Sequence, residues 1–430
     1  MNRKILDIAL PSIVSNITVP LLGLVDTAIV GHLGSAAYIG AIAVGGMLFN
    51  MVYWLFGFLR MGTGGLTAQA QGANDMKETF RILMRALGVA GILSFFLIVL
   101  QEPILSVAFH FINATPEVIE LSSIYFRVLI WGAPAVLGLY GFIGWFLGKQ
   151  NARFPMVIAI VQNIVNISAS LFLVLYCGWK VEGVALGTLI AQYSGFLLAL
   201  ALWFKRYGKD FHWKELGGIW KRTALVRFFQ VNRDIFLRTL CLLSVTTYFT
   251  SAGAAQGDTI LAVNALLMQF FILFSYIMDG FAYAGEAIGG LYFGARDKQS
   301  FKRFTRVLFV WGTGLSAIFT LVYGLGGSSF LSLLTDEAPV ISSALEYLPF
   351  AVAIPFVSFA AFLYDGLFID TTSTRGMLIA VAGASLGFFL CQFALFPLWG
   401  NQALWTAFLL YLFLRGAIQW AYYGRIERKL

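Results

Sequence analysis

The sequence predicts an all-α membrane protein with twelve transmembrane helices. Of its 430 residues, 59% are hydrophobic and only 12% are charged, half of the ~25% found in soluble domains. A soluble fold of this length could not hide so many apolar side chains, because a large share of its residues must face water. The 41 Phe, 17 Tyr and 11 Trp residues also exclude a disordered chain.

The apolar segments have the length of membrane spans. A helix needs ~20 apolar residues to cross a bilayer. By that measure we predict spans at residues 5–30, 38–60, 80–101, 119–147, 155–177, 183–204, 225–252, 259–286, 302–325, 340–369, 376–398 and 402–424. The first span is too long for a signal peptide and lacks a small-residue cleavage site, so we expect it to stay in the mature protein.

The basic residues predict the orientation of the spans. Cytoplasmic loops of membrane proteins are rich in Lys and Arg. With a cytoplasmic N-terminus, the inner segments hold all 29 basic residues except Lys180 and Arg127, and Arg238 and Arg415 count among the inner ones. We therefore predict a multi-pass protein of the inner or plasma membrane with both termini in the cytoplasm. The net charge of +8 then requires no nucleic-acid partner.

The two halves of the chain are related by a shift of 222 positions. The shift pairs the loop motif GAND (72–75) with GARD (294–297), Gly144 with Gly366, and Gly178 with Gly400. We predict an N-terminal lobe of six spans (1–204), a basic cytoplasmic linker (205–224) and a C-terminal lobe of six spans (225–430). Since six is even, the lobes are parallel repeats about an axis along the membrane normal, as in several secondary transporters.

Several motifs carry a resemblance to a known family. They are LVDTAIVGHLG (24–34), the GAND and GARD loops, NIVNISAS (163–170), GVALGT (183–188) and DGFAYAGEAIGG (279–290). In their order and spacing, the chain resembles the multidrug and toxic compound extrusion (MATE) family, and within it the DinF-like branch. The resemblance implies twelve helices in two lobes around a central cleft, and export of organic compounds driven by a proton or sodium gradient.

Asp26 is the candidate coupling group. It lies toward the outer end of the first span, beyond Pro11 and Pro20, which we expect to bend that helix. A carboxylate in hydrocarbon costs at least ~2.5–3.5 kcal/mol on insertion scales, so one that persists has a partner or a function. We interpret Asp26 as a carboxyl that binds and releases a proton or cation. The alternative is a helix-end carboxylate near the water interface.

Neutral oxygens accompany this acid in the fifth and sixth spans. Asn166 and Ser170 share a helix face, and Thr188 returns to a similar depth after a short turn. The resemblance implies that these three residues complete the ion site of Asp26. Archaeal-type members carry a second carboxylate where this chain has Ser170, which favours protons over sodium without excluding sodium. The alternative role for such residues is hydrogen bonding between helices, which we expect for Asn163.

The second lobe has three intramembrane acids of its own. Asp279, Glu286 and Asp365 align by the repeat with Gly57, Gly64 and Ile143. They are candidates for a second coupling site or for attraction of substrate. Alternatively, they pair with basic residues near the inner face, namely Arg233, Arg238 or Arg375. Nearer the inner interface, we expect Asp234 and Asp370 to pair with charges.

Substrate contacts are expected from aromatic and Met side chains, because such walls repack around varied ligands. The candidates are Met51, Tyr53, Trp54, Phe274, Met278 and Phe281. Arg127 is the only basic residue that we place well inside a span, and we expect it to pair with Glu117 or Glu120.

These observations favour a proton-coupled antiporter that exports amphipathic, often cationic compounds by alternating access. A sodium-coupled exporter and a lipid flippase are the alternatives, although a pyrophosphate headgroup would require several basic residues in the cavity. A channel lacks a repeated filter segment, and an enzyme lacks a nucleophile–base pair or metal-ligand spacing. We expect small organic substrates and membrane lipids as partners, a monomer, and no metal or cofactor.

Overall fold

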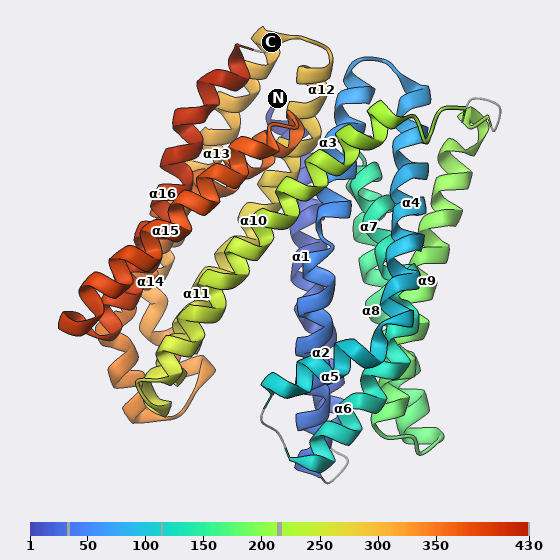
Figure 1. Ribbon diagram of the computed structural model, residues 1–430. Coiled ribbons are helices and arrows are strands. Elements are labelled where there is room, and N and C mark those ends of the chain that lie inside the picture. Colours follow the sequence, from blue (N-terminus) through green and yellow to red (C-terminus); the bar gives the residue numbers. More distant parts are fainter. Residues whose placement is uncertain (32–34, 113–114, 213–216, 429–430) are drawn as a thin grey trace. The chain divides into compact units, whose positions relative to one another are not determined.

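The computed structural model describes residues 1–31, 35–112, 115–212 and 217–428, and these residues are helical almost throughout (Figure 1). The elements are α1 (Asn2–Gly31), α2 (Ala36–Leu55), α3 (Phe58–Gly72), α4 (Met76–Val99), α5 (Gln101–Phe111), α6 (Pro116–Leu129), η1 (Ile130–Gly132), α7 (Ala133–Gly148), α8 (Arg153–Leu171), η2 (Phe172–Tyr176), α9 (Val181–Tyr207), η3 (Gly208–Asp210), α10 (Arg222–Ala254), α11 (Asp258–Ala284), η5 (Gly285–Gly289), α12 (Gly290–Gly294), α13 (Lys298–Leu334), α14 (Ala338–Asp370), α15 (Thr374–Trp399) and α16 (Asn401–Glu427).

The helices confirm the predicted fold class. Eleven helical segments of the described chain are long and apolar enough to cross a membrane, and α1 adds a helix of 30 residues, about 45 Å long. Hydrocarbon offers no hydrogen-bond partners, so a helix is the structure that satisfies the backbone of each span internally. Several helices extend beyond the predicted spans. The ninth span, predicted at 302–325, is part of α13 (Lys298–Leu334), and α5 was not predicted at all.

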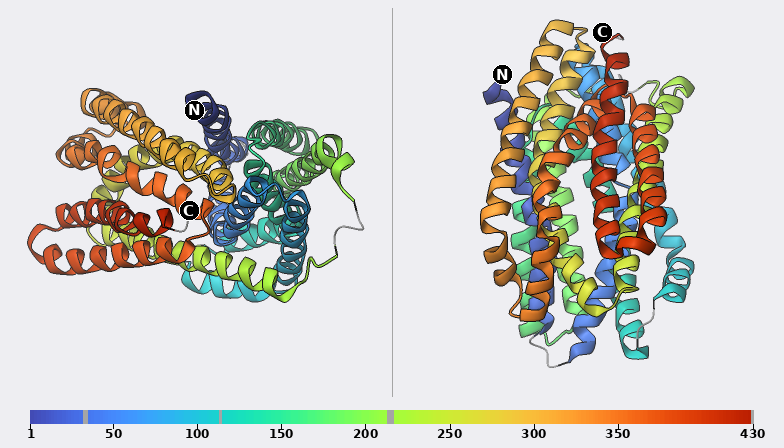
Figure 2. Two further views of the ribbon diagram at one scale, coloured as in Figure 1. Left: turned by 90° about the horizontal axis from the view of Figure 1, so that it is seen from above. Right: turned by 90° about the vertical axis from the view of Figure 1, so that its left-hand side faces the viewer.

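The chain divides into two compact units. The N-terminal unit is Leu10–Phe228, and the C-terminal unit combines Met1–Ala9 with Phe229–Leu430. The first residues join the C-terminal unit through contacts such as that of the Trp311 indole N–H with the Asn2 side-chain oxygen, at 3.3 Å. Within the N-terminal unit α7 packs against α3, α4 and α9, and α8 packs along α9. Within the C-terminal unit α14 packs against α11, α13 and α16, and α15 lies along α16 (Figure 2).

The 222-residue repeat is present in the backbone itself. Among the described residues, four that are not glycine have a positive φ, and they form two pairs at that spacing: Asn74 (59°) with Arg296 (55°), and Gln150 (60°) with Thr372 (49°). Gly178 (71°) and Gly400 (51°) form a third pair. Left-handed backbone is uncommon outside glycine. Its recurrence at equivalent positions shows that corresponding turns of the two halves have the same conformation.

A close helix contact is repeated at the same spacing. A Cβ built on Gly144 of α7 lies 2.2 Å from the backbone carbonyl oxygen of Arg60, and one built on Gly366 of α14 lies 2.3 Å from that of Ala282. Both glycine and both carbonyl positions are 222 residues apart. In membranes, small residues let helix backbones approach one another. Each half therefore uses the same glycine to bring its central helix against a neighbour.

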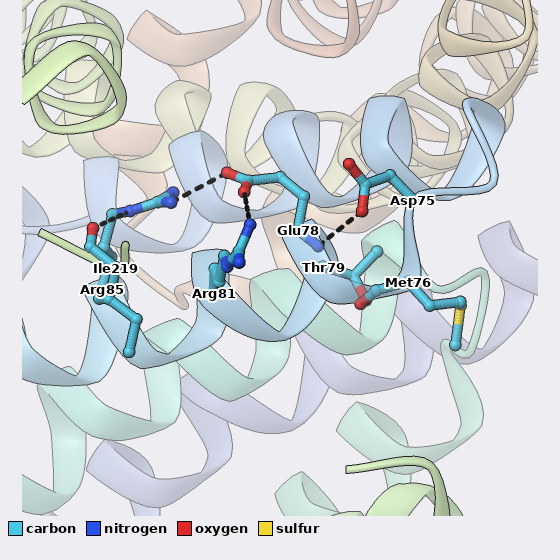
Figure 3. A network of polar contacts seen from close by, with 7 residues as sticks. All are labelled: Asp75, Met76, Glu78, Thr79, Arg81, Arg85 and Ile219. Atoms are coloured by element: carbon cyan, nitrogen blue, oxygen red, sulfur yellow. Dashed lines mark hydrogen bonds and ion pairs between the residues drawn. The ribbon is translucent and has the colours of Figure 1, made fainter. Parts of the chain in front are cut away.

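The GAND and GARD loops end in equivalent helix caps. The Asp75 side chain accepts the Glu78 backbone N–H at the start of α4, and Asp297 accepts the Ser300 N–H at the start of α13, both at 2.9 Å. An aspartate at this position satisfies a backbone donor that the helix leaves without a partner. The first cap lies beside Arg85, which donates to Glu78 and, at 2.7 Å, to the backbone carbonyl of Ile219 (Figure 3). Arg85 thereby holds part of the predicted linker on α4.

Candidate functional site

Three helices of the N-terminal unit bring together the polar residues predicted around Asp26. Asp26 lies in the last turns of α1, Asn166 in α8 and Thr188 in α9. The turn between α8 and α9 is short because Gly178 adopts a left-handed conformation, so the two helices pack along each other. The sequence prediction that these residues lie at a similar depth is consistent with direct contacts between their side chains.

The contacts form a directed chain of hydrogen bonds. The Asn166 side-chain amide donates to the Thr188 hydroxyl at 2.8 Å, and the Thr188 hydroxyl donates to Asp26 Oδ2 at 3.2 Å. A threonine hydroxyl has one proton to give. Because an amide N–H occupies an acceptor position of that hydroxyl, its proton is directed at the carboxylate. Asp26 and Asn166 are both buried.

Three further oxygen atoms of this site are buried and have no hydrogen-bond partner within the described part of the chain. They are Asp26 Oδ1, Asn166 Oδ1 and Ser170 Oγ. Ser170 packs directly on α9, where a Cβ built on Gly187 lies 2.2 Å from its hydroxyl oxygen. A buried polar atom without a partner is costly, and each one calls for an explanation. The donor set of one carboxylate and neutral oxygens suits a proton or a small hard cation.

Tyr125 is a residue of this site that sequence reasoning missed. It lies in α6, is buried, and interacts with both the Asp26 carboxylate and the Thr188 side chain. The 222-residue shift pairs it with Tyr347. A phenol in an otherwise apolar helix was the available signal, but the sequence did not show which helix faces Asp26. Asn163 differs from expectation, since its amide donates to the Ala159 carbonyl of its own helix at 2.8 Å and not to another helix.

The second-lobe acids do not form a single cluster of free carboxylates. Asp365 of α14 is bound by Arg238 of α10 and by Arg415 of α16, so the predicted pairing with Arg238 is present. Arg238 and Arg415, which were counted with the inner segments, lie inside helical segments long enough to cross a membrane, Arg222–Ala254 and Asn401–Glu427, and both side chains are buried. The statement that Arg127 is the only basic residue well inside a span is wrong for the same reason.

The other acids of the C-terminal unit have different surroundings. Glu286, in the π-helical turn η5, and Asp370, at the end of α14, are both buried. Asp370 interacts electrostatically with Glu286, so the two acids lie near each other. Asp234 is held by Arg233 at 2.9 Å and by the Thr374 hydroxyl at 3.1 Å. Asp279 of α11 is half-buried.

The six candidates for substrate contact fall into two groups. Tyr53, Phe274, Met278 and Phe281 are buried inside their own units, whereas Met51 and Trp54 of α2 are exposed. Phe274 packs against Phe319 and Phe362, with ring centroids 5.4 and 6.3 Å apart. The buried members therefore contribute to helix packing in this conformation. Pro11 and Pro20 both lie inside α1, which continues through them as a helix.

Arg127 has a partner that the sequence did not indicate. Its guanidinium donates to both carboxylate oxygens of Glu102, at 2.8 and 3.0 Å. The predicted partners Glu117 and Glu120 were therefore wrong, because the unpredicted helix α5 carries Glu102 to Arg127. The bidentate bond lowers the pKa of Glu102 below its ordinary value. Both side chains are exposed, so the pair contributes little to stability.

Comparison with known proteins identifies relatives over the whole chain. The MatE family model matches residues 11–172 and 235–393. The chain is 38% identical over 425 residues to DNA damage-inducible protein F of Escherichia coli (strain K12), covering 96% of this chain and 90% of that protein. It is 25% identical over 448 residues to Protein DETOXIFICATION 44, chloroplastic, of Arabidopsis thaliana, covering 96% and 81%.

Solved structures share the fold. A crystal structure of MATE in the bent conformation superposes with a TM-score of 0.87 at 18% identity, covering 100% of this chain and 96% of that one. A MOP superfamily transporter from Pyrococcus furiosus Vc1 gives a TM-score of 0.84 at 18% identity, covering 99% and 96%.

Proposed function

Because the chain belongs to the MATE family of membrane transporters, we propose that it is a proton antiporter with Asp26 as its coupling group. The family match confirms the resemblance indicated by the motifs, and members of this family are transporters and not enzymes. The proposed substrates are amphipathic, often cationic organic compounds, exported against an inward flow of protons. We further propose that it acts as a monomer in the inner or plasma membrane.

The observation that carries the proposal is that only one of the two Asp26 carboxyl oxygens has a hydrogen-bond partner in the described residues. Oδ2 accepts the Thr188 hydroxyl, whereas Oδ1 is buried without a hydrogen-bond partner in the described residues. A proton bound at Oδ1 would remove the buried charge, and Oδ1 would change from an acceptor without a partner into a hydrogen-bond donor. Asn166 Oδ1 and Ser170 Oγ, on the helix that packs along α9, are buried acceptors that also have no partner in the described residues. Protonation therefore changes both the charge and the hydrogen bonding between α1, α8 and α9.

Such a change can bias a conformational equilibrium. A ligand can shift the equilibrium between two conformational states only by the difference in its binding free energy for them. A proton that binds Asp26 more tightly in one state than in the other supplies that difference, and the gradient then drives the transport cycle. The Thr188 hydroxyl, held by Asn166, keeps the carboxylate oriented in the deprotonated state.

Sodium coupling is the second candidate, and the same oxygen atoms favour it. Asp26 Oδ1, Asn166 Oδ1 and Ser170 Oγ are the hard ligands that a sodium ion needs. Only one of them carries a charge, which weakens binding of a cation relative to a site with two carboxylates. We therefore rank the proton first.

The test is Asp26→Asn, assayed by dye efflux from proteoliposomes under separately imposed proton and sodium gradients. The amide keeps the shape of the side chain and cannot exchange a proton. We expect gradient-driven efflux to fall to background, while dye binding without a gradient persists, because removal of a buried charge relieves desolvation. The matched control is Asp7→Asn on the same helix, where the carboxylate is exposed beside Arg3, and it should transport normally.

Parental efflux with unchanged proton dependence in Asp26→Asn would contradict the assignment. The search for the coupling group would then move to Asp279 and the other acids of the C-terminal unit. If Asp26→Asn abolishes the efflux driven by a sodium gradient but not the efflux driven by a proton gradient, the coupling ion is sodium. Asp26 would then remain the residue that binds the ion.

We also propose that both termini and the 205–224 linker are cytoplasmic. Residues 213–216 of that linker lie outside the described part of the chain. The exposed residues Lys209 and Ser329 provide a test: single cysteines introduced there in a cysteine-free background should react with an impermeant reagent from opposite sides of the membrane.

A further inference from the structure

A buried network of charges connects three helices of the C-terminal unit. Asp365 of α14 accepts hydrogen bonds from Arg238 of α10, from Arg415 of α16 at 2.8 Å and from Gln419 of α16 at 2.6 Å. The two arginines share one carboxylate oxygen, Oδ2, and Gln419 occupies the other. The residues are 6%, 6%, 4% and 0% exposed in the order Asp365, Arg238, Arg415, Gln419.

Arg85 shows what a fully satisfied buried arginine looks like in this protein. It is 2% exposed. Its Nε donates to the Ile219 carbonyl and its Nη2 to Glu78, so one guanidinium has one carboxylate and a backbone acceptor (Figure 3). Arg85 thus has a carboxylate partner and an acceptor for its Nε–H, although the other oxygen of Glu78 also pairs with Arg81, at 3.8 Å.

Arg238 and Arg415 lack that complement of acceptors. The Nε atoms of both are buried and have no hydrogen-bond partner in the ranges that the structure describes, and the same is true of the Tyr411 hydroxyl beside them. Two guanidiniums therefore direct more donors into the network than the single Asp365 carboxylate accepts. Asp279 of α11, which is half-buried, acts on Arg415 as an additional negative charge, yet both Nε atoms still have no hydrogen-bond partner among the described residues.

This excess of donors has a chemical preference. Guanidinium groups bind carboxylates through paired N–H donors, and they do so most strongly where water is excluded. A buried guanidinium with unmet donors is costly, and a second carboxylate group would meet them. Arg415 also lies over the Tyr411 and Phe362 rings, at 5.6 and 5.9 Å from their centroids, so an aromatic surface adjoins the charge.

We propose that Arg238 and Arg415 bind the carboxylate group of a transported aromatic acid or zwitterion, and that Asp365 takes the place of that group when no substrate is bound. The ring of the substrate would pack beside Phe362 and Tyr411. This site extends the substrate range beyond cationic compounds. It rests on the family's role in export and does not depend on coupling at Asp26.

The experiment compares two probes that differ in charge and hardly in shape. Full-length protein in phosphatidylcholine nanodiscs is titrated with 2-naphthoate, which is ionised at pH 7, and with the neutral 2-naphthamide. The measured quantity is the ratio of the two dissociation constants, amide over carboxylate. We expect a ratio of about ten or more for the unmodified protein, as for one strong charge-assisted hydrogen bond.

Three variants separate binding from a structural role. Asp365→Asn removes the internal competitor and should raise the ratio by roughly another tenfold. The triple variant Asp365→Asn/Arg238→Gln/Arg415→Gln carries no charge in the network, is expected to fold for that reason, and should have a ratio near one. Arg127→Gln removes an exposed arginine elsewhere and should leave the ratio unchanged. A network that only stabilises the fold predicts the same ratio in every variant that folds.

Several outcomes would overturn the proposal. They are a ratio near one in the unmodified protein, an unchanged or lower ratio in Asp365→Asn, and a preference for naphthoate that survives in the triple variant. If neither network variant folds, the unmodified protein still decides through its own ratio. A preference that disappears in nanodiscs containing phosphatidylglycerol would assign the arginines to a lipid phosphate and would also overturn it. No gradient is applied, so failure of coupling at Asp26 cannot be mistaken for any of these results.

Discussion

The two halves share a backbone design but differ in where they place polar groups. In the N-terminal unit, Asp26 and Asn166 belong to a site of buried oxygens. The residues 222 positions later are Tyr248 and Phe388, and their rings pack edge to face with centroids 6.0 Å apart. The repeat position of Thr188 is Leu410. The C-terminal unit therefore fills with aromatic packing the region where the N-terminal unit has its candidate ion site.

The reverse holds for the charge network. Asp365 corresponds to Ile143, and Arg238 and Arg415 correspond to Asn16 and Tyr193. The N-terminal unit thus lacks the acid and both arginines at these positions. The comparison teaches that caps, left-handed turns and close glycine contacts preserve the architecture of the repeat. A few substitutions on that common scaffold then give each half its own chemistry.

The largest effect is expected where the two halves are most alike. Gly144→Ala and Gly366→Ala should each destabilise the protein by about 1–3 kcal/mol, because the added methyl group overlaps a backbone oxygen that cannot move independently. The measurement is thermal stability in detergent by size-exclusion fluorescence. Gly91→Ala and Gly314→Ala are matched controls, since nothing lies within 4 Å of either added Cβ. Sensitivity at only one of the two glycines would break the equivalence.

The next effect separates the halves. Thr188→Val keeps the shape of the side chain but removes the hydroxyl that donates to Asp26. A hydrogen bond to a charged group contributes ~1.5–3 kcal/mol, so gradient-driven efflux should fall by about tenfold or more. Leu410→Val, at the repeat position, should have no such effect. Equal loss in both variants would mean that packing, not the hydrogen bond, matters at this position.

A smaller effect concerns the coupling ion. Ser170→Asp places a second carboxylate one helical turn from Asn166 and should increase the response of transport to sodium, because charged oxygens strengthen cation binding. Sodium-dependent efflux is compared with the parent at identical proton gradients. Ser170→Asn adds similar bulk without charge and serves as the control. An unchanged sodium response would show that this face of α8 does not line an ion site.

The smallest effect is expected at the helix caps. The hydroxyl and backbone N–H of Ser300 lower the pKa of Asp297. Because its folded pKa is below the unfolded value, the cap contributes stability above the unfolded pKa and loses it as the pH falls through the folded pKa. Asp297→Ala should therefore lower thermal stability slightly at pH 6, with the difference shrinking toward pH 3. Asp297→Asn keeps a cap without that titration. If the difference in thermal stability does not depend on pH, the charge of Asp297 does not contribute to the stability of the cap.

Most of the fold was predictable because both the hydropathy pattern and the repeat can be read from the linear sequence. The length of an apolar run determines where a helix can cross a membrane, and the 222-residue spacing aligned Gly144 with Gly366 before any contact was known. The helix α5 escaped prediction because it is short. The grouping of residues 1–9 with the C-terminal unit could not be predicted either, since nothing in that segment indicates its partners.

For the candidate ion site too, the identity of the polar residues was predictable from the sequence and their contacts were not. The sequence predicted Asp26, Asn166, Ser170 and Thr188 to be polar residues within spans, because position along an apolar helix is a local property. The hydrogen bond from Thr188 to Asp26 and the position of Tyr125 beside them depend on how α1, α6 and α9 pack, which the sequence does not show.

The arginines show the limit most clearly. The excess of basic residues on one side led to Arg238 and Arg415 being counted with the inner segments, although both are buried against Asp365. Hydropathy and charge bias depend on position along the chain, whereas a buried ion network depends on which faces of three distant helices meet. That meeting is a property of packing, and packing is determined by the whole fold.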